Sequence, residues 1–131
     1  MEKQRNHPSP LKFWLWFYPI GRQAGGWGFI LQRVTGLGLT FYLYLHLAVL
    51  GLLAKGPDGY DRFLVLAHTP LFVFGELLVV AAGILHGLNG IRVALTAFGV
   101  SVTRQRQLFF GLMAIAMISI VVFGIRMFNV R

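Results

Sequence analysis

The sequence predicts an all-α integral membrane protein with three transmembrane helices, and three observations support this prediction. Of its 131 residues, 56% are hydrophobic and only 12% are charged, whereas soluble domains average about 25% charged residues. The apolar residues gather in three stretches long enough to cross a hydrocarbon core of about 30 Å, which takes roughly 20 helical residues. Three such stretches are too few to close a β-barrel, so helices are the spanning structure that satisfies the backbone.

The same composition excludes several classes of protein. A disordered chain is poor in apolar residues, and a soluble enzyme of this size could not hide so much apolar surface. The chain contains no cysteine, which excludes disulfides, iron–sulfur ligation and covalently attached c-type haem. Because a glycine-rich phosphate loop, a Ser/His/Asp set and a zinc signature are all absent from the sequence, we expect no catalytic residues.

The segment before the first apolar stretch predicts an interfacial piece of chain. It contains Trp14, Trp16 and Tyr18, and such aromatic residues favour the boundary between lipid and water. No small-residue cleavage site follows the first stretch, so we expect no signal peptide.

The three spans are predicted within a single domain covering residues 1–131, at about residues 29–54, 71–96 and 107–127. The second span contains one acidic residue, Glu76, for which the sequence suggests no specific role.

The connection between the first two spans is short. Lys55–Gly59 has the glycines and proline of a turn, and residues 60–68 can form a short interfacial helix. Pro70 then begins the second span, at a position where a helix tolerates proline.

Basic residues are more numerous on the N-terminal side of the predicted spans. That side carries Lys3, Arg5, Lys12, Arg22, Arg33, Arg92, Arg104 and Arg106. The other side carries Lys55, Arg62, Arg126 and Arg131, partly offset by Asp58 and Asp61. The positive-inside rule therefore places the N-terminus in the cytoplasm, and we expect a multi-pass protein of a prokaryotic cytoplasmic membrane. The net charge of +8 then reflects topology and anionic lipid, and we expect no nucleic-acid partner.

Polar groups inside a span are costly and usually functional. The spans contain few of them, namely Gln32, Arg33, Thr35, Thr40, His46, Glu76, His86, Asn89 and Ser119. His46 lies about 18 Å along the first span, and His86 lies about 22 Å along the second span, which runs the opposite way. The two histidines are therefore expected at different depths and are not expected to ligate the same metal or haem.

The surroundings of His86 favour a flat cofactor. Gly83 and Gly90 flank it at i−3 and i+4 on the same helix face, which clears space for a planar ring. The alternatives are a packing face with a hydrogen-bonded histidine and a histidine in a proton relay. For His46, which has Tyr42 at i−4, the alternative to ligation is a hydrogen bond to a neighbouring helix.

Arg33 and Arg92 lie at the cytoplasmic edges of the first and second spans. Snorkelling to the interface accounts for Arg92, which we keep as a second candidate for contact with a haem propionate. Arg33 lies in a helix that has already begun. There its guanidinium could pair with haem propionates or donate to a quinone carbonyl.

Two motifs, one in each of the first two spans, resemble a known pattern. Gln32-Arg33-Val34-Thr35-Gly36 resembles the His-Arg-x-Ser/Thr-Gly motif of the cytochrome b membrane-anchor subunits of succinate dehydrogenase and fumarate reductase. His86-Gly87-Leu88-Asn89-Gly90-Ile91-Arg92 resembles the His-x-x-x-Gly-Ile/Leu-Arg motif of the same family. The resemblance extends roughly from Pro8 to the end of the chain.

The resemblance implies a membrane-anchor subunit of succinate:quinone oxidoreductase. His86 matches the family's axial haem ligand, and Arg33 matches the arginine at the quinone and propionate end. His46 has a counterpart in the two-haem members, where it ligates the outer haem. The chain would thus bind one or two b-type haems, shared with a second three-helix anchor subunit in a six-helix bundle.

The remaining implied partners are a flavoprotein subunit, an iron–sulfur subunit and a quinone. The quinone would receive the electrons that the complex takes from succinate in the tricarboxylic acid cycle. The chain would then be a non-catalytic subunit of an enzyme and not an enzyme alone.

This sequence departs from the family pattern at two positions. Gln32 stands where a histidine is usual, and Phe29 stands where many members carry a serine, so quinone contact carries over to Arg33 alone. Two other functions are alternatives: a haem b anchor of another quinone-linked dehydrogenase, and a haem-free small transporter or structural anchor. A transporter would use Glu76, His86 and Arg33 as a proton or ion pathway.

Overall fold

The computed structural model describes residues 24–100 and 102–130, and within these ranges it is helical with no strand. The elements are α1 (Ala24–Leu53), α2 (Pro57–Ala67), α3 (Pro70–Ala97), η2 (Val102–Arg104) and α4 (Gln105–Asn129). Three helical stretches, Gly25–Leu53, Pro70–Ala97 and Val102–Asn129, are long and apolar enough to cross a membrane. The predicted all-α membrane fold is therefore confirmed, while the predicted interfacial N-terminal segment lies outside the described residues.

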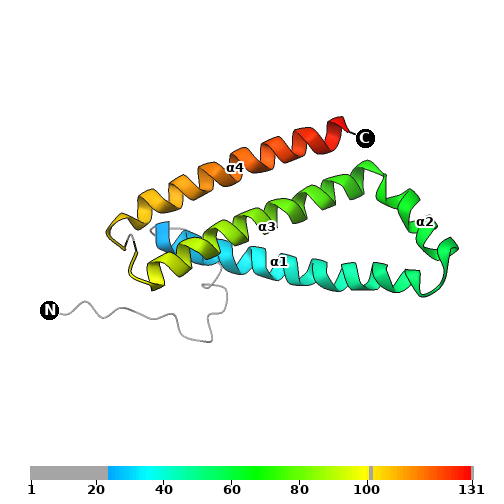
Figure 1. The fold of residues 1–131 in the computed structure, drawn as a ribbon, viewed down its shortest axis with the longest axis horizontal. Coiled ribbons are helices and arrows are strands. Elements are labelled where there is room, and N and C mark those ends of the chain that lie inside the picture. Colours follow the sequence, from blue (N-terminus) through cyan, green and yellow to red (C-terminus); the bar gives the residue numbers. More distant parts are fainter. Residues whose placement is uncertain (1–23, 101, 131) are drawn as a thin grey trace.

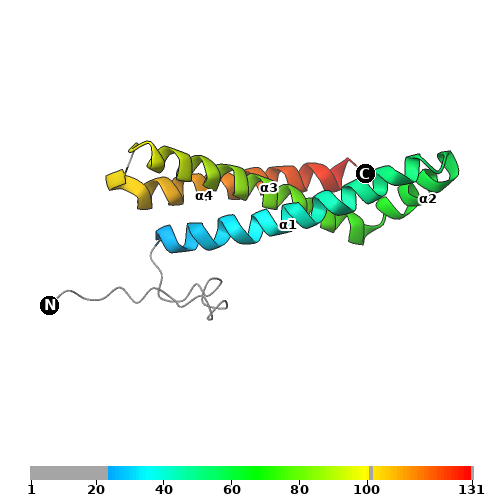
Figure 2. The same ribbon diagram turned by 90° about the horizontal axis from the view of Figure 1, so that it is seen from below.

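The central helix of the molecule is α3. Helix α4 runs beside it along its length in both views, and α1 packs against it from the other side (Figures 1 and 2). Figure 1 shows α1 and α3 diverging toward α2, which connects their far ends. The start of α1, the end of α3 and the start of α4 therefore share one end of the molecule.

The turn after α1 is shorter than the sequence predicted. Gly56 has φ = 91°, a left-handed conformation that favours glycine, and α2 begins directly after it at Pro57. Helix α2 can begin there because proline is well suited to the first helical position and Asp58 places a negative charge in the first turn. The Phe63 ring then meets Phe72 of α3 edge to face, with centroids 5.9 Å apart, and this contact holds α2 against α3.

The described chain has almost no hydrophobic core of its own. Ile30, Val73 and Ala116 are its buried hydrophobic residues, whereas large apolar side chains are exposed on every helix. From residue 37 to residue 53, no side chain of α1 is buried. Such surface suits lipid or another membrane chain, because water would disfavour it.

Glycine allows the close approach of α1 and α3. A Cβ atom on Gly28 would lie 2.8 Å from Cζ of Arg92 and 2.9 Å from Oδ1 of Asn89. A Cβ atom on Gly38, farther along the same helix, would meet nothing within 4 Å. Small residues at such crossings let membrane helices pack closely.

These two glycines yield a matched prediction about stability. We expect Gly28→Ala to lower the free energy of unfolding by about 1–3 kcal/mol, because the Arg92 guanidinium must move and give up its hydrogen bond to Asn89. Gly38→Ala should instead be neutral or stabilising by up to about 1 kcal/mol, since alanine favours a helix interior over glycine. Thermal unfolding of the two variants in detergent measures the difference, and equal stabilities would contradict the helix crossing described here.

Candidate functional site

A cluster of polar side chains joins α1 to α3 in the half of the molecule away from α2. On α3, His86, Asn89 and Arg92 follow one another at three-residue intervals and share one helix face. They contact the first half of α1 at Gly28, Gln32 and Thr35. These three residues are four and three positions apart, so they also share one helix face. We call these six residues the polar cluster.

Both nitrogens of the His86 ring contact α1. Nδ1 lies 3.1 Å from Oγ1 of Thr35, and Nε2 lies 3.3 Å from Nε2 of Gln32. A Cβ atom on Gly36 would lie 3.2 Å from Cε1 of the imidazole, so this glycine lets the ring pack against the α1 backbone. The hydrogen-bonded histidine that the sequence left as an alternative to ligation is thus present, and the partners come from a neighbouring helix.

Asn89 lies at the centre of the polar cluster and is fully buried. Its Nδ2 donates to the carbonyl of Gly28 at 2.7 Å and to Oε1 of Gln32 at 2.8 Å. Its Oδ1 accepts from Nε of Arg92 at 3.1 Å. Within the described part of the chain, no fully buried side-chain nitrogen or oxygen lacks a hydrogen-bond partner, as the interior of a membrane protein requires.

The snorkelling expected of Arg92 is wrong. Its side chain is only 6% exposed, and Cζ lies 5.4 Å from the centroid of the Phe109 ring of α4. The physical reason is the space left by Gly28, which admits the guanidinium between the helices, together with the hydrogen bond to Asn89. Arg92 therefore connects all three long helices.

Arg33 lies outside the polar cluster and is half-buried. Its Cζ lies 4.2 Å above the centroid of the Phe29 ring, one turn earlier on α1. This distance allows a cation–π interaction. Phe29, one of the two departures from the family pattern, thus supports the Arg33 guanidinium.

The structure places His46 far from the polar cluster. It is exposed on α1, about 15 Å farther along the helix than Gly36, which contacts the His86 ring. Its Nδ1 lies 3.5 Å from the Tyr42 hydroxyl of the same helix, and the two ring centroids are 5.6 Å apart. The two histidines therefore lie at different levels and cannot bind one metal within this chain.

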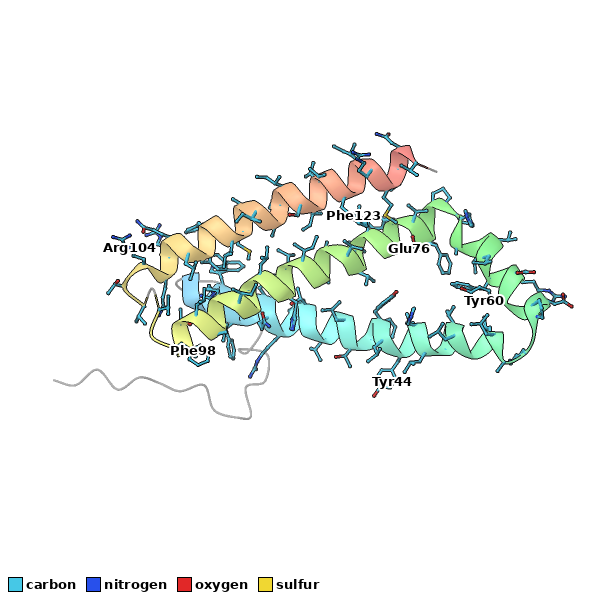
Figure 3. All side chains as sticks on the ribbon, in the orientation of Figure 1. Tyr44, Tyr60, Glu76, Phe98, Arg104 and Phe123 are labelled. Atoms are coloured by element: carbon cyan, nitrogen blue, oxygen red, sulfur yellow. The ribbon has the colours of Figure 1, made fainter. Side chains whose placement is uncertain are left out.

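The remaining candidates lie on α3. A Cβ atom on Gly90 would lie 3.4 Å from Nε2 of Gln32, so Gly90 faces α1 beside the polar cluster. A Cβ atom on Gly83 would meet nothing within 4 Å, which leaves open space next to that position. Glu76 lies nearer the α2 end of α3 (Figure 3).

Sequence reasoning missed the pairing of these groups. Gln32, Thr35 and Asn89 were recognised as polar residues inside spans, but their contacts with His86 and with each other were not predicted. The available signal was their spacing, because each helix repeats a polar residue every three or four positions along one face.

The chemistry open to this cluster is limited. Residues 24–100 and 102–130 contain no group of three or more His, Cys, Asp or Glu side chains that could hold a metal ion. A metal centre at the cluster would therefore take one ligand, His86, from the described part of this chain.

Comparisons with known proteins agree with the two motifs. The model of the succinate dehydrogenase/fumarate reductase transmembrane subunit family matches residues 6–125. Succinate dehydrogenase 2 membrane subunit SdhC of Mycobacterium tuberculosis is 33% identical over 84 residues, which are 64% of this chain and 62% of that protein. The succinate dehydrogenase hydrophobic membrane anchor subunit of Halobacterium salinarum is 31% identical over 88 residues, which are 66% of this chain and 68% of that protein.

The family match covers all of α1, α2 and α3 and most of α4, and it includes the whole polar cluster. The mycobacterial match spans less than two thirds of its relative's length. This chain belongs to the family of succinate dehydrogenase and fumarate reductase transmembrane subunits.

Proposed function

We propose that this chain is a cytochrome b membrane-anchor subunit of succinate:quinone oxidoreductase, which binds b-type haem through His86 and helps to form a quinone site. The observation that carries the proposal is the His86 imidazole, held inside a membrane span by side chains of a second span. Intramembrane ionisable residues of this kind are usually functional.

The hydrogen bonds of the polar cluster suit His86 to bind a haem iron. A ligating histidine commonly donates its second ring N–H to a nearby oxygen, and Thr35 offers such an oxygen 3.1 Å from Nδ1. The other nitrogen, Nε2, faces only the Gln32 amide at 3.3 Å, a long hydrogen bond that a bond to iron can replace. When bound, haem supplies one-electron redox chemistry.

In this proposal the chain's own side chains hold the haem in place and compensate the charge of its propionates. His86 would hold the haem iron, and Arg33, over the Phe29 ring, would supply guanidinium donors for a haem propionate or a quinone carbonyl. Arg92 acts mainly as a link between helices, because its Nε is already bonded to Asn89 and its side chain is buried.

A second three-helix anchor subunit completes the bundle in this proposal. The partner would pack on the apolar surface of α1 from residue 37 to residue 53, where no side chain is buried. The partner would supply the other axial ligand, and the exposed His46 would be available for a second haem at the outer level. A flavoprotein and an iron–sulfur subunit would dock at the cytoplasmic face and deliver electrons to the quinone.

The spectrum of the purified complex tests the haem assignment. We expect a reduced b-type haem band in the wild-type complex and its loss or displacement in His86→Ala, because the axial ligand is removed. His68→Ala is the matched control, since His68 is exposed near α2 and its Nδ1 lies 2.7 Å from the Leu64 carbonyl. A wild-type complex without a b-type haem band, or a His86→Ala spectrum identical to that of the wild type, would overturn the assignment and favour a haem-free anchor.

Quinone kinetics test Arg33. Loss of a charged hydrogen bond costs about 1.5–3 kcal/mol, so Arg33→Gln should lower kcat/KM for quinone roughly 10- to 100-fold. Reduction of a water-soluble dye by the hydrophilic subunits should stay unchanged. Arg62→Gln, at an exposed position on α2, is the control. Equal quinone kinetics in both variants would exclude Arg33 from the quinone site.

Reporter fusions test the orientation. The end of the molecule near α2 carries the acidic residues Asp58 and Asp61, whereas η2 and the first turn of α4 carry Arg104 and Arg106. We therefore expect the α3–α4 link in the cytoplasm and the C-terminus outside. Alkaline phosphatase fused after residue 131 should be active, and the same enzyme inserted near Gly99 should be inactive. The reverse pattern would contradict this orientation.

A further inference from the structure

We infer that Thr35 is a positioning residue that, in concert with Gln32, holds the proton of His86 on Nδ1, so that Nε2 carries the lone pair. The inference extends the proposed function, because Nε2 is the nitrogen that a haem iron would bind. Thr35 itself does not contact the iron in this scheme. It acts through the imidazole, because its Oγ1 accepts a hydrogen bond from the Nδ1–H group.

The hydroxyl proton of Thr35 is already engaged. Oγ1 donates to the carbonyl of Leu31 at 2.6 Å, a short hydrogen bond within α1, and the carbonyl of Gln32 lies farther away at 3.3 Å. A hydroxyl has one proton and two lone pairs. Toward His86, 3.1 Å away, Thr35 can therefore act only as an acceptor, and the ring nitrogen facing it must be the donor.

The hydrogen bonds at the opposite end of the polar cluster lead to the same donor and acceptor roles for the His86 ring. Arg92 can only donate, so the Asn89 atom that faces its Nε is the amide oxygen. The Asn89 nitrogen then donates to the Gly28 carbonyl, which can only accept, and to the amide oxygen of Gln32. These two groups that cannot reverse their roles fix the orientation of the Asn89 amide.

The orientation of the Asn89 amide determines which nitrogen of the His86 imidazole is protonated. Since the Gln32 oxygen accepts from Asn89, the Gln32 nitrogen faces His86, and an amide nitrogen can only donate. Nε2 of His86 must therefore be the acceptor and unprotonated. Reversing Gln32 would place two amide nitrogens opposite each other beside the fully buried Asn89. The hydrogen bonds at both ends of the polar cluster thus require the same tautomer.

This assignment gives two residues distinct roles. Thr35 holds the proton on Nδ1, which leaves Nε2 ready to ligate, and its hydrogen bond makes the ligating nitrogen more basic. Gln32 occupies the lone pair of Nε2, so its amide must withdraw when iron binds there. Both nitrogens of His86 thus lie against α1, Nδ1 as a donor to Thr35 and Nε2 as an acceptor from Gln32.

Nitrogen NMR tests the tautomer without haem. The full chain, labelled with ¹⁵N-histidine and reconstituted in lipid bilayers without haem, should show protonated Nδ1 and unprotonated Nε2 for His86. The signal is assigned by its loss in His86→Gln. Thr35→Val, which keeps the shape but removes the acceptor, should leave Nε2 unprotonated opposite Gln32 but shift the Nδ1 signal, because the Nδ1 proton loses its hydrogen-bond partner. Thr35→Ser should restore the wild-type signal. A protonated Nε2 in the wild-type chain overturns the inference, even where Thr35→Val fails to fold.

The haem midpoint potential tests the consequence in the purified complex. Thr35→Val should shift the potential to a more positive value than that of the wild type, because a less basic histidine stabilises ferric iron less. Thr35→Ser should return the potential toward the wild-type value. Identical potentials in the wild type and Thr35→Val overturn the positioning role. A wild-type complex without haem defeats the proposed function, whereas the NMR result still decides the tautomer.

Discussion

The buried amide of Asn89 is the interaction on which the rest of the structure depends. It holds the backbone of α1 through the Gly28 carbonyl, orients Gln32 and anchors the guanidinium of Arg92. In hydrocarbon no water can replace these partners, so each group must find its partner within the protein. The amide has one acceptor atom and two donor hydrogens, and all are engaged here, which fixes both the spacing and the register of α1 against α3.

The polar cluster also explains why the molecule is tight at one end and open at the other. Around Gly28 and Gln32, hydrogen bonds join α1 to α3, and the absence of a side chain on glycine lets the two helices approach closely. Beyond residue 37, α1 has no buried side chain, and it diverges from α3 (Figure 1). Apolar contact between helices gains little when lipid is the competing environment, so polar pairing and glycine packing determine which halves meet. The open half of α1 is left for lipid or a partner chain.

Hydropathy predicted the fold well, because long apolar stretches in a membrane have few structures available. It also identified His86, Asn89 and Gln32 as polar groups needing an explanation. The pairing between helices was not predictable in the same way, since it depends on the register of two helices far apart in sequence. Arg92 shows the limit most clearly: its place at the end of a span suggested snorkelling, but the space beside Gly28 that the guanidinium fills exists only after α1 and α3 have packed. Gly90 was predicted to clear space for a cofactor, and the sequence did not indicate that a Cβ atom there would lie 3.4 Å from Nε2 of Gln32.

Gln32 connects the departure from the family motif to the chemistry of the site. Its amide presents an acceptor and a donor on one small planar group, and the structure uses the acceptor for Asn89 and the donor for His86. A glutamate at this position could still accept from Asn89 but could not donate to His86, and its charge would be costly at this depth. A leucine would leave the second hydrogen of the Asn89 amide unpaired in a buried setting. The amide at position 32 is thus matched to the buried asparagine on one side and to the unprotonated histidine nitrogen on the other, so the tautomer of His86 and the register of the helices are set by the same few hydrogen bonds.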